Sequence, residues 1–459
     1  MMAAANGDPP SSGGQFAVEH EDDEEQRDPT QARPPQIAWP PAGYRTSGDS
    51  LLDAPVQATH LDAAGAKAVC ATLGYFEDPW IGQIVPAFVA GRKSPIMHRG
   101  YYLRYTAMRR AAERFIKAAD PNLPIQIVDL GAGLNTLYWY VAANIEKWGR
   151  KLEDLVFFEA DFPVIVSKKT KTLLSKLNTL PRGRELLRLD VGSGPPGSSS
   201  GDVTMHEDHR GPVPAGAGPG LPPPLPNANG ARQVVVGGRV LSGPGAPTTS
   251  SNGTSGVTSS PTTTSSENLT TMSATHRVQQ FHTAHYRLVA CDMRQPREFQ
   301  DSLFHAGWNG MANTLFVSEC VLVYMQGQFG DEVIKSCLQL CQEPSGRALK
   351  EFVVYEQCNP DTAFGKMMVR NLHQRGCPLM SITDYKTPAD QEARYKALGF
   401  AEAKAWTMNE HERRVMTDEE LKRIGRLEFL DEVEELRLFQ DHYFLLVACN
   451  QGYKPEEIY

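Results

Sequence analysis

One segment constrains the fold of this chain more than any other: an apolar strand that runs into a tight glycine turn, which then opens a helix. The segment reads Gln126-Ile-Val-Asp129-Leu-Gly131-Ala-Gly133-Leu-Asn-Thr136. Glycines are needed where the backbone reverses or where a ligand approaches it closely. In a doubly wound sheet, the crevice at the carboxyl ends of the strands is the usual ligand site. The turn therefore predicts such a crevice, with a strand-to-helix turn that binds nothing as the alternative.

The details of this turn favour one kind of cofactor over another. Thr136 stands where a dinucleotide-binding fingerprint has its third glycine, which counts against a pyrophosphate on the helix N-terminus. Asp129, just before the turn, is the acidic residue typical of S-adenosylmethionine sites. We therefore weigh a nicotinamide-dependent oxidoreductase below a methyltransferase.

Short β-branched runs alternate with longer helical patterns along the chain. The expected strands are residues 125–130, 155–158, 286–291, 314–324, 352–355, 402–408 and 442–449, and helical patterns include 136–147, 331–341 and 419–439. Such alternation predicts a mostly parallel sheet with helices on both faces. Residues 60–120 look helical and precede the first strand, so we expect them to form a lid over the carboxyl edge of this α/β doubly wound fold.

Two low-complexity segments divide the chain. Residues 1–57 hold ten Asp and Glu against three Lys and Arg, and residues 192–276 hold four against three, so they carry all of the net charge of −8. Both are rich in residues that cannot bury a core, and we expect them to be disordered. The fold then consists of a lid and first half over 58–191 and a second half over 277–459. Because this body is close to neutral, we expect no nucleic-acid partner.

Other classes are excluded by simple features. The longest apolar runs, 314–325 and 442–449, are far shorter than the ~20 residues of a membrane span. The N-terminus has no secretory pattern, and the eight cysteines include no CxxC pair. We expect reduced thiols, no metal, no membrane contact and a cytoplasmic monomer, with the nucleus as a second compartment.

Acidic residues follow several of the expected strands. Glu159 and Asp161 end the second strand on the same side, where either could accept the ribose hydroxyls of an adenosine moiety. Asp292 and Met293 end the third strand, where a carboxylate could take an adenine amino group and a thioether could pack on the ring. A solvated strand end explains any one of these acids equally well.

Two charged features have a clearer meaning. Glu319 lies in continuous apolar strand sequence, where an unpaired charge costs several kcal/mol, so we expect a functional partner rather than a purely structural ion pair. Arg104 closes a basic and aromatic stretch, Arg99-Gly-Tyr-Tyr-Leu-Arg104, that could bind carboxylates through the planar arginine fork. A solvated basic helix face is the alternative for this stretch.

Together these motifs resemble the leucine carboxyl methyltransferases, which methylate the C-terminal leucine of the protein phosphatase 2A catalytic subunit. The matching stretches are LGYFEDP from residue 73, RGYYLR from 99, VDLGAGLNT from 128, EADFP from 159, SECVLVYM from 318, YEQ from 355 and LEFLDE from 427. They cover residues 60–190 and 280–450 in order and are specific only jointly. The insert of about 85 residues between the second and third strands departs from the family, although a long surface insertion costs little in closure entropy.

The resemblance implies a seven-stranded class I methyltransferase fold that uses S-adenosylmethionine. It assigns the cofactor to seven residues: Lys67, Arg104, Gly131, Asp161, Asp292, Met293 and Glu319. This mapping favours Asp161 over Glu159.

We expect the helical region around residues 60–120, with Tyr324 and the segment near Glu356, to form the pocket for the phosphatase tail, where Arg104 also helps to position the carboxylate. A C-terminal carboxylate has a pKa of ~3.5 and is already ionised, so no catalytic acid or base is expected.

Three alternatives stay open. A related methyltransferase acts in tRNA wybutosine synthesis but usually carries a long C-terminal propeller. A nicotinamide-dependent oxidoreductase is opposed by Thr136. A non-catalytic scaffold that sequesters the phosphatase would have no need of a complete cofactor pocket.

Overall fold

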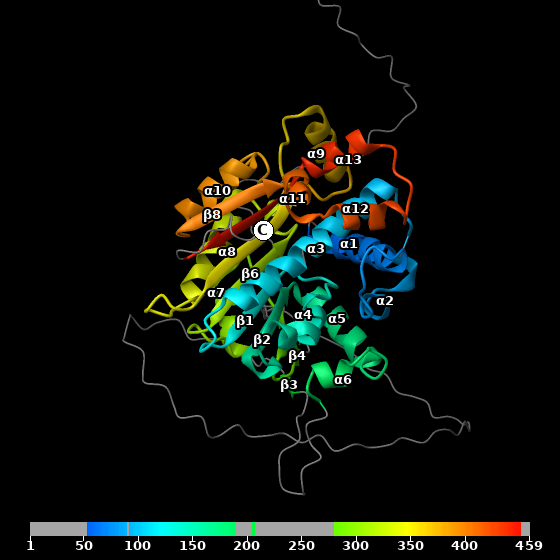
Figure 1. The fold of residues 1–459 in the computed structure, drawn as a ribbon. Helices are drawn as coiled ribbons and strands as arrows, with labels where there is room; N and C mark the ends of the chain where they lie inside the picture. The colour runs from blue at the N-terminus through cyan, green and yellow to red at the C-terminus, as the bar shows by residue number, and fades with distance from the viewer. Residues whose placement is uncertain (1–52, 90, 190–203, 207–279, 451–459) are drawn as a thin grey trace, which may run out of the picture. The chain divides into compact units, whose positions relative to one another are not determined.

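A nine-stranded sheet forms the centre of the computed structural model, which describes residues 53–89, 91–189, 204–206 and 280–450. In chain order the strands are β1 (Ile125–Leu130), β2 (Leu155–Asp161), β3 (Thr204–His206), β4 (Gln280–His282), β5 (Tyr286–Ala290), β6 (Asn313–Glu319), β7 (Lys350–Gln357), β8 (Glu402–Thr407) and β9 (Tyr443–Cys449). They are hydrogen-bonded in the order β3-β4-β5-β2-β1-β6-β7-β9-β8 (Figure 1).

The direction of the strands confirms the expected fold class. Strands β5, β2, β1, β6 and β7 run parallel, and β9 pairs antiparallel with both β7 and β8. The strand order reverses at β1, with β2 on one side and β6 on the other, and ligands of α/β sheets bind at such a switch point. The seven strands from β5 to β8 form the mostly parallel sheet that the resemblance predicted.

Three details differ from the sequence expectation. The sheet has nine strands rather than seven, because β3, inside the low-complexity segment, pairs with β4 and extends one edge. The strand expected over 314–324 ends at Glu319, because Cys320 takes a left-handed φ of 59° and the short helix η4 (Leu322–Tyr324) follows. The helix expected over 419–439 is broken into two helices by the loop 426–432.

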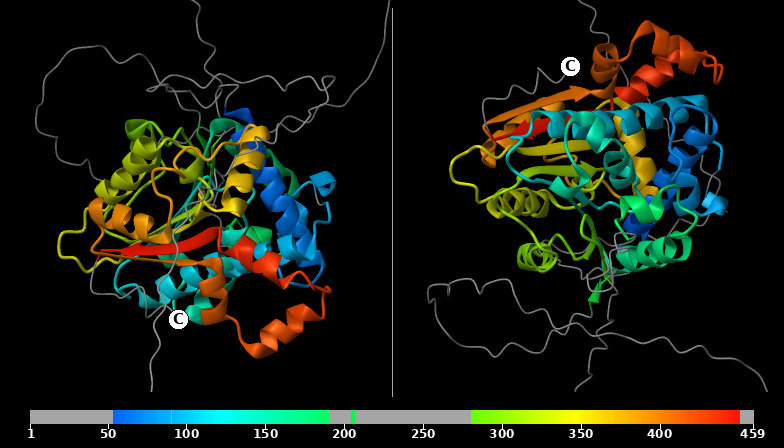
Figure 2. Two further views of the ribbon diagram at one scale, coloured as in Figure 1. Left: turned by 90° about the horizontal axis from the view of Figure 1, so that it is seen from above. Right: turned by 60° about the horizontal axis from the view of Figure 1, so that its bottom comes forward.

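Helices cover both faces of the sheet (Figure 2). They are α1 (Ala54–Thr72), α2 (Ile81–Ile84), α3 (Pro95–Ala118), α4 (Leu137–Asn144), α5 (Pro163–Lys176), α6 (Gly183–Leu186), α7 (Pro296–His305), α8 (Gly327–Leu340), α9 (Ala363–Gln374), α10 (Pro388–Ala397), α11 (Met408–Val415), α12 (Asp418–Gly425) and α13 (Val433–Gln440). Side chains alternate along the strands, so Ile127 and Val317 join the core under α3 and α4, whereas Val128 and Phe316 join the core under α7, α8 and α10.

The first three helices lie where a lid was expected. α1 packs against α3, and its His60 contacts Gly133 of the glycine turn at the carboxyl end of β1. α1 begins at Ala54, so the helical region starts four residues before the expected boundary at 58. The remainder of the segments expected to be disordered, apart from β3, lies outside the described residues.

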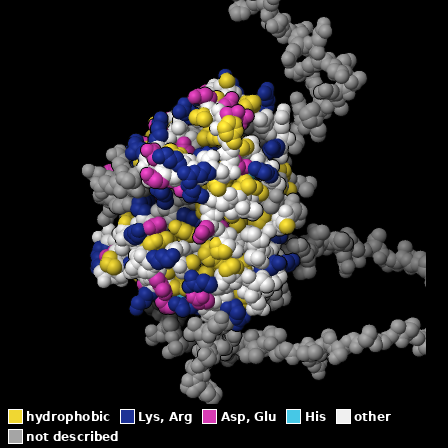
Figure 3. All heavy atoms as spheres, turned by 45° about the vertical axis from the view of Figure 1, so that its right-hand side comes forward, with side chains coloured by type: hydrophobic (Ala, Val, Ile, Leu, Met, Phe, Trp, Pro, Cys, Tyr) yellow, Lys and Arg dark blue, Asp and Glu magenta, His cyan; other side chains and the backbone are white. Residues whose placement is uncertain are grey.

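Two properties of the surface complete the description. On the face seen in Figure 3, hydrophobic side chains gather in patches between Lys or Arg and Asp or Glu side chains. None of the described helices is long and apolar enough to cross a membrane.

Candidate active site

The glycine turn after β1 has a backbone that only glycine adopts easily. Gly131 and Gly133 have φ values of 63° and 52°. A Cβ on Gly131 would lie 2.6 Å from Cγ2 of Val321, and one on Gly133 would lie 2.7 Å from Cβ of His60. The turn is therefore enclosed by α1 on one side and by the bend after β6 on the other.

The two acids at the end of β2, Asp161 and Glu159, have different partners. Asp161 lies at the turn, where its Oδ2 accepts the Gly133 N–H at 2.8 Å and its Oδ1 accepts its neighbour Phe162 N–H at 2.7 Å. Burial raises the pKa of Asp161 to about 6, although both backbone donors oppose the shift. Glu159 instead forms a buried ion pair with Lys169. Both acids line the small cavity beside Gly133, and Asp161 is the one that accepts a hydrogen bond from the turn.

Glu319 joins two cations that are far apart in the sequence. Its Oε1 lies 2.6 Å from Nζ of Lys67 on α1 and accepts the Nε–H of Arg104 on α3. The Glu319 side chain is 7% exposed. Burial alone would raise its pKa, but Arg104 and Lys67 outweigh burial and hold the pKa at about 2. The group carries one positive charge in excess at the carboxyl end of β6.

Aromatic side chains surround this charged group. The Arg104 guanidinium lies 5.0 Å from the ring centre of Tyr355 and 5.5 Å from that of Tyr101. Tyr443 stacks on Tyr355 at 5.4 Å, and the half-buried Tyr324 follows the bend after β6. Sequence reasoning named Tyr324 alone, although Tyr101 and Tyr355 stand in the RGYYLR and YEQ stretches.

Asp292 and Met293 follow β5 and are buried. The Asp292 carboxylate accepts hydrogen bonds from the Arg294 side chain at 2.9 and 2.8 Å. Arg294 also donates to both carboxylate oxygens of Asp53, which precedes α1. The bond between Asp53 and Arg294 was not anticipated, because no local pattern connects residues 241 positions apart.

The expected contact of Glu356 with a substrate needs correction. Glu356 is 1% exposed, and its Oε1 accepts the N–H groups of Val321 and Val323 at 3.2 and 3.0 Å. Burial raises its pKa, whereas these donors lower it. Glu356 therefore holds the bend after β6 in place, and Tyr324 reaches the site because of that bend.

The donor groups fit the two ends of S-adenosylmethionine, but the space beside the turn is small. Two cations and a carboxylate match its amino acid end, and Asp161 beside the turn matches its ribose. The cavity lined by Gly133, Asp161, Ile165 and Lys169 has a volume of 10 Å³, about that of one water molecule. S-adenosylmethionine is larger than this cavity, and His60 of α1 lies beside the turn.

No group of three His, Cys, Asp or Glu in the described part of the chain is arranged to hold a metal ion.

Comparison with known proteins finds the following similarities. The family model described as leucine carboxyl methyltransferase matches residues 262–337. A leucine carboxyl methyltransferase 1 homolog of Arabidopsis thaliana is 26% identical over 87% of this chain and 90% of its own length. The tRNA wybutosine-synthesizing protein 4 of Homo sapiens is also 26% identical over 86% of this chain, but the match spans 44% of that protein. Among solved structures, a methyltransferase from Thermobifida fusca aligns with a TM-score of 0.36 at 10% identity, over 77% of this chain and 83% of that one.

Proposed function

We propose that this chain, which belongs to the leucine carboxyl methyltransferase family, uses S-adenosylmethionine to methylate the C-terminal leucine carboxylate of the protein phosphatase 2A catalytic subunit. The observation that carries the proposal is the convergence of Lys67 and Arg104 on Glu319, next to the glycine turn. A structural ion pair needs one cation, and the second leaves an excess charge that suits an incoming carboxylate.

Each residue of the crevice has a part in binding. Lys67 and Arg104 would hold the carboxylate of the cofactor and Glu319 its amino group. Asp161 would accept the ribose hydroxyls, and Asp292 with Met293 would border the adenine. Gly131 would let the cofactor approach the backbone closely, since the turn has no room for a Cβ at this position.

When bound, S-adenosylmethionine supplies a methyl group activated by its positively charged sulfur. The chain itself orients the substrate and excludes water. Burial keeps the pKa of Tyr324 and Tyr355 well above the ordinary value, so both present neutral hydroxyls and aromatic faces around Arg104. Holding an ionised carboxylate in line with the methyl in such a pocket can contribute ~7–11 kcal/mol without an acid or base.

A tRNA substrate is the second candidate, because the wybutosine-synthesizing relative is as similar in sequence as the leucine carboxyl methyltransferase homolog. The balanced charge of the body favours a protein substrate, since an RNA-binding surface usually carries a large basic excess.

Transfer of labelled methyl from S-adenosylmethionine tests the proposal. We expect label in intact phosphatase 2A catalytic subunit, lost on mild alkaline hydrolysis as a methyl ester, and none in a subunit that lacks its last leucine. Glu319→Ala should abolish the transfer. Equal labelling of the truncated subunit would reject the leucine specificity, and label in tRNA instead would favour the second candidate.

A further inference from the structure

The Arg104 guanidinium has one edge left with which to bind a ligand. Its Nε donates to Oε1 of Glu319, and its Nη2 lies 3.5 Å from the carbonyl oxygen of the same residue. Among the described residues, Nη1 has no hydrogen-bond acceptor. Since a guanidinium binds a carboxylate through its N–H groups, the direction of Nη1 decides where a carboxylate can bind.

The carboxylate of Glu319 does not fix this direction by itself. Lys67 and Arg104 both contact the same oxygen, Oε1. Arg104 therefore does not form the two parallel bonds through which a carboxylate orients a guanidinium. Other groups must hold the plane of the guanidinium.

A row of aromatic side chains extends from this guanidinium to α13. The Arg104 guanidinium lies 5.0 Å from the ring centre of Tyr355, within the ~6 Å range of a cation–π contact. Tyr443 stacks on Tyr355 with an angle of 19° between the rings, and the ring centre of Phe439 lies 5.0 Å from that of Tyr443. We call Tyr355, Tyr443 and Phe439 the aromatic row.

The aromatic row is packed at both of its ends. Tyr355 is 2% exposed, and Tyr101 on α3 lies 5.5 Å from the same guanidinium. At the other end, Phe439 packs against Gly100 of α3, where a Cβ would clash with its ring. The glycine of the RGYYLR stretch thus admits the ring that ends the row.

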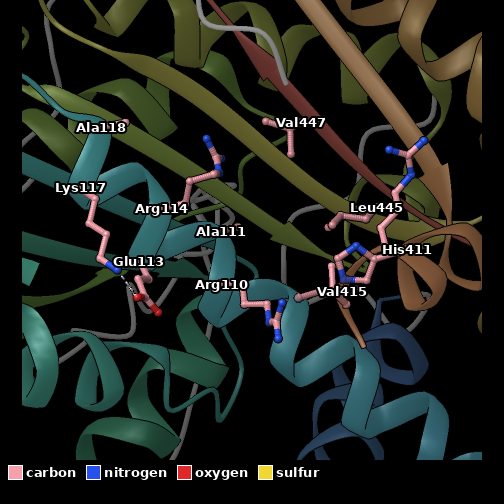
Figure 4. Close-up of a pocket in the computed structure, with 12 residues that line it drawn as sticks. Arg110, Ala111, Glu113, Arg114, Lys117, Ala118, His411, Val415, Leu445 and Val447 are labelled. Carbon is pink, nitrogen blue, oxygen red and sulfur yellow. Dashed lines mark hydrogen bonds and ion pairs between the residues drawn. The ribbon is translucent and has the colours of Figure 1, made fainter. Parts of the chain in front are cut away.

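Cations farther along α3 are held in another way. Arg114 and Lys117 line a hollow of 690 Å³ between α3, α11 and β9 (Figure 4). Arg114 pairs with Glu351, and Lys117 pairs with Glu113. Each of these cations has an acid to itself, whereas Arg104 shares its carboxylate with a lysine and lies against the aromatic row.

We propose that Tyr355 is a positioning residue for cofactor binding: with Tyr443 behind it, its ring fixes the plane of the Arg104 guanidinium so that Nη1 meets the carboxylate of S-adenosylmethionine. This role rests on the cofactor of the proposed function but not on the identity of the methyl acceptor. The ring carries the role, because a cation–π contact is made by the ring face rather than by the hydroxyl.

Calorimetry with two ligands tests this role. S-adenosylhomocysteine has the amino acid end of the cofactor, whereas 5′-methylthioadenosine lacks it. Tyr355→Leu should weaken binding of S-adenosylhomocysteine by about tenfold and change binding of 5′-methylthioadenosine by less than about twofold. Tyr355→Phe should bind both ligands as the wild type does. A merely structural role of Tyr355 would weaken binding of both ligands alike.

Tyr140→Leu is the matched control. The Tyr140 ring centre also lies 5.0 Å from the guanidinium of an arginine on α3, Arg109, but its charged neighbours are side chains of α3 rather than of the crevice. We expect this variant to bind S-adenosylhomocysteine as the wild type does. Equal weakening in the control would overturn the proposal.

Three further results would also overturn it: unchanged affinity for S-adenosylhomocysteine in Tyr355→Leu, loss of both ligands in that variant, or weak binding by Tyr355→Phe. A wild-type chain that binds S-adenosylhomocysteine but transfers no methyl to the phosphatase would reject the proposed substrate and leave the role of Tyr355 intact. A wild-type chain that binds no S-adenosylhomocysteine would reject both.

Discussion

Glu319 is the residue on which the crevice depends. A buried carboxylate is normally forced toward its neutral form, yet Arg104 and Lys67 keep the pKa of this one at about 2. It is therefore ionised at every working pH. The two cations are in turn held by Glu319, and burial lowers the pKa of Lys67 against this attraction.

Glu319→Gln should lower the free energy of unfolding by about 3–5 kcal/mol, because two buried cations lose their counter-charge. Urea unfolding measures this loss, and methyl transfer should fall with it. Glu351→Gln is the control: it breaks the buried pair with Arg114 on the same sheet but away from the crevice. Wild-type stability of Glu319→Gln, or equal loss of cofactor affinity in both variants, would contradict this role.

Asp161 should make cofactor binding depend on pH. Its pKa in the fold, about 6, lies above the ordinary value of 3.8. The protonated form is thus favoured by folding, so its contribution to stability is complete below about pH 4 and lost as the pH rises through 6. Cofactor binding depends on pH in the opposite direction. It strengthens as the pH rises, because the ribose hydroxyls need an ionised carboxylate as their acceptor.

We therefore expect affinity for S-adenosylhomocysteine to rise between pH 5 and 7, as followed by calorimetry. Asp161→Asn should bind weakly with a flat profile, since Glu319 does not titrate in this range. An unchanged rise in Asp161→Asn would assign the titration to another group.

The sequence could predict some of these residues from local chemistry and others only from the resemblance. A charge inside an apolar strand indicated Glu319 directly. Lys67 stands in an ordinary alanine-rich helix, and its ion pair spans 252 positions of the chain, so only the resemblance assigned it. Glu356 was expected to contact a substrate, but its partners are backbone groups of a bend that no sequence pattern indicates.

At the scale of elements, two backbone bends shape the crevice. Gly131 follows β1, and Cys320 follows the neighbouring β6, both with positive φ. Val321, just beyond the second bend, contacts the first. The elements themselves were largely predictable from the alternation of strands and helices, but the end of β6 was not, because Cys320–Tyr324 is as apolar as the strand before it.

Gly131→Ala should destabilise the chain through both its φ and its contact with Val321. Gly149→Ala is the matched control, because Gly149 also has a positive φ, 79°, but no atom lies within 4 Å of its added Cβ. We expect a loss of about 1–2 kcal/mol for Gly149→Ala and an additional ~1–3 kcal/mol for Gly131→Ala. Equal losses in thermal or urea unfolding would mean that Val321 does not enclose the turn.

Ion pairs hold α1 near both of its ends: Asp53 pairs with Arg294, and Lys67 pairs with Glu319. Because α1 covers the turn, we expect S-adenosylhomocysteine to slow hydrogen exchange in residues 54–72. Asp53→Ala should speed exchange there without affecting β1 or β6. Asp361→Ala, which breaks an exposed pair with Lys386, is the control. If the hydrogen-exchange rate of α1 changes neither with S-adenosylhomocysteine nor in Asp53→Ala, this helix is not a lid.

At the scale of the whole described fold, the crevice draws on elements that are far apart in the sequence. α3 carries Arg104, β6 carries Glu319 and β7 carries Tyr355. The long insert leaves β3 and returns to β4 at the edge beyond β5, whereas β9 and β8 form the other edge. The insert therefore joins the sheet next to β5, the strand that leads to Asp292 and Met293.

Equilibrium binding of S-adenosylmethionine to the full-length chain is the most direct test of this account. Calorimetry at neutral pH should give one site per chain, displaced by S-adenosylhomocysteine and indifferent to nicotinamide dinucleotides, with the heat lost in Arg104→Ala. A chain that takes up no S-adenosylmethionine, or an Arg104→Ala variant that binds it as tightly as the wild type, would contradict the crevice described here.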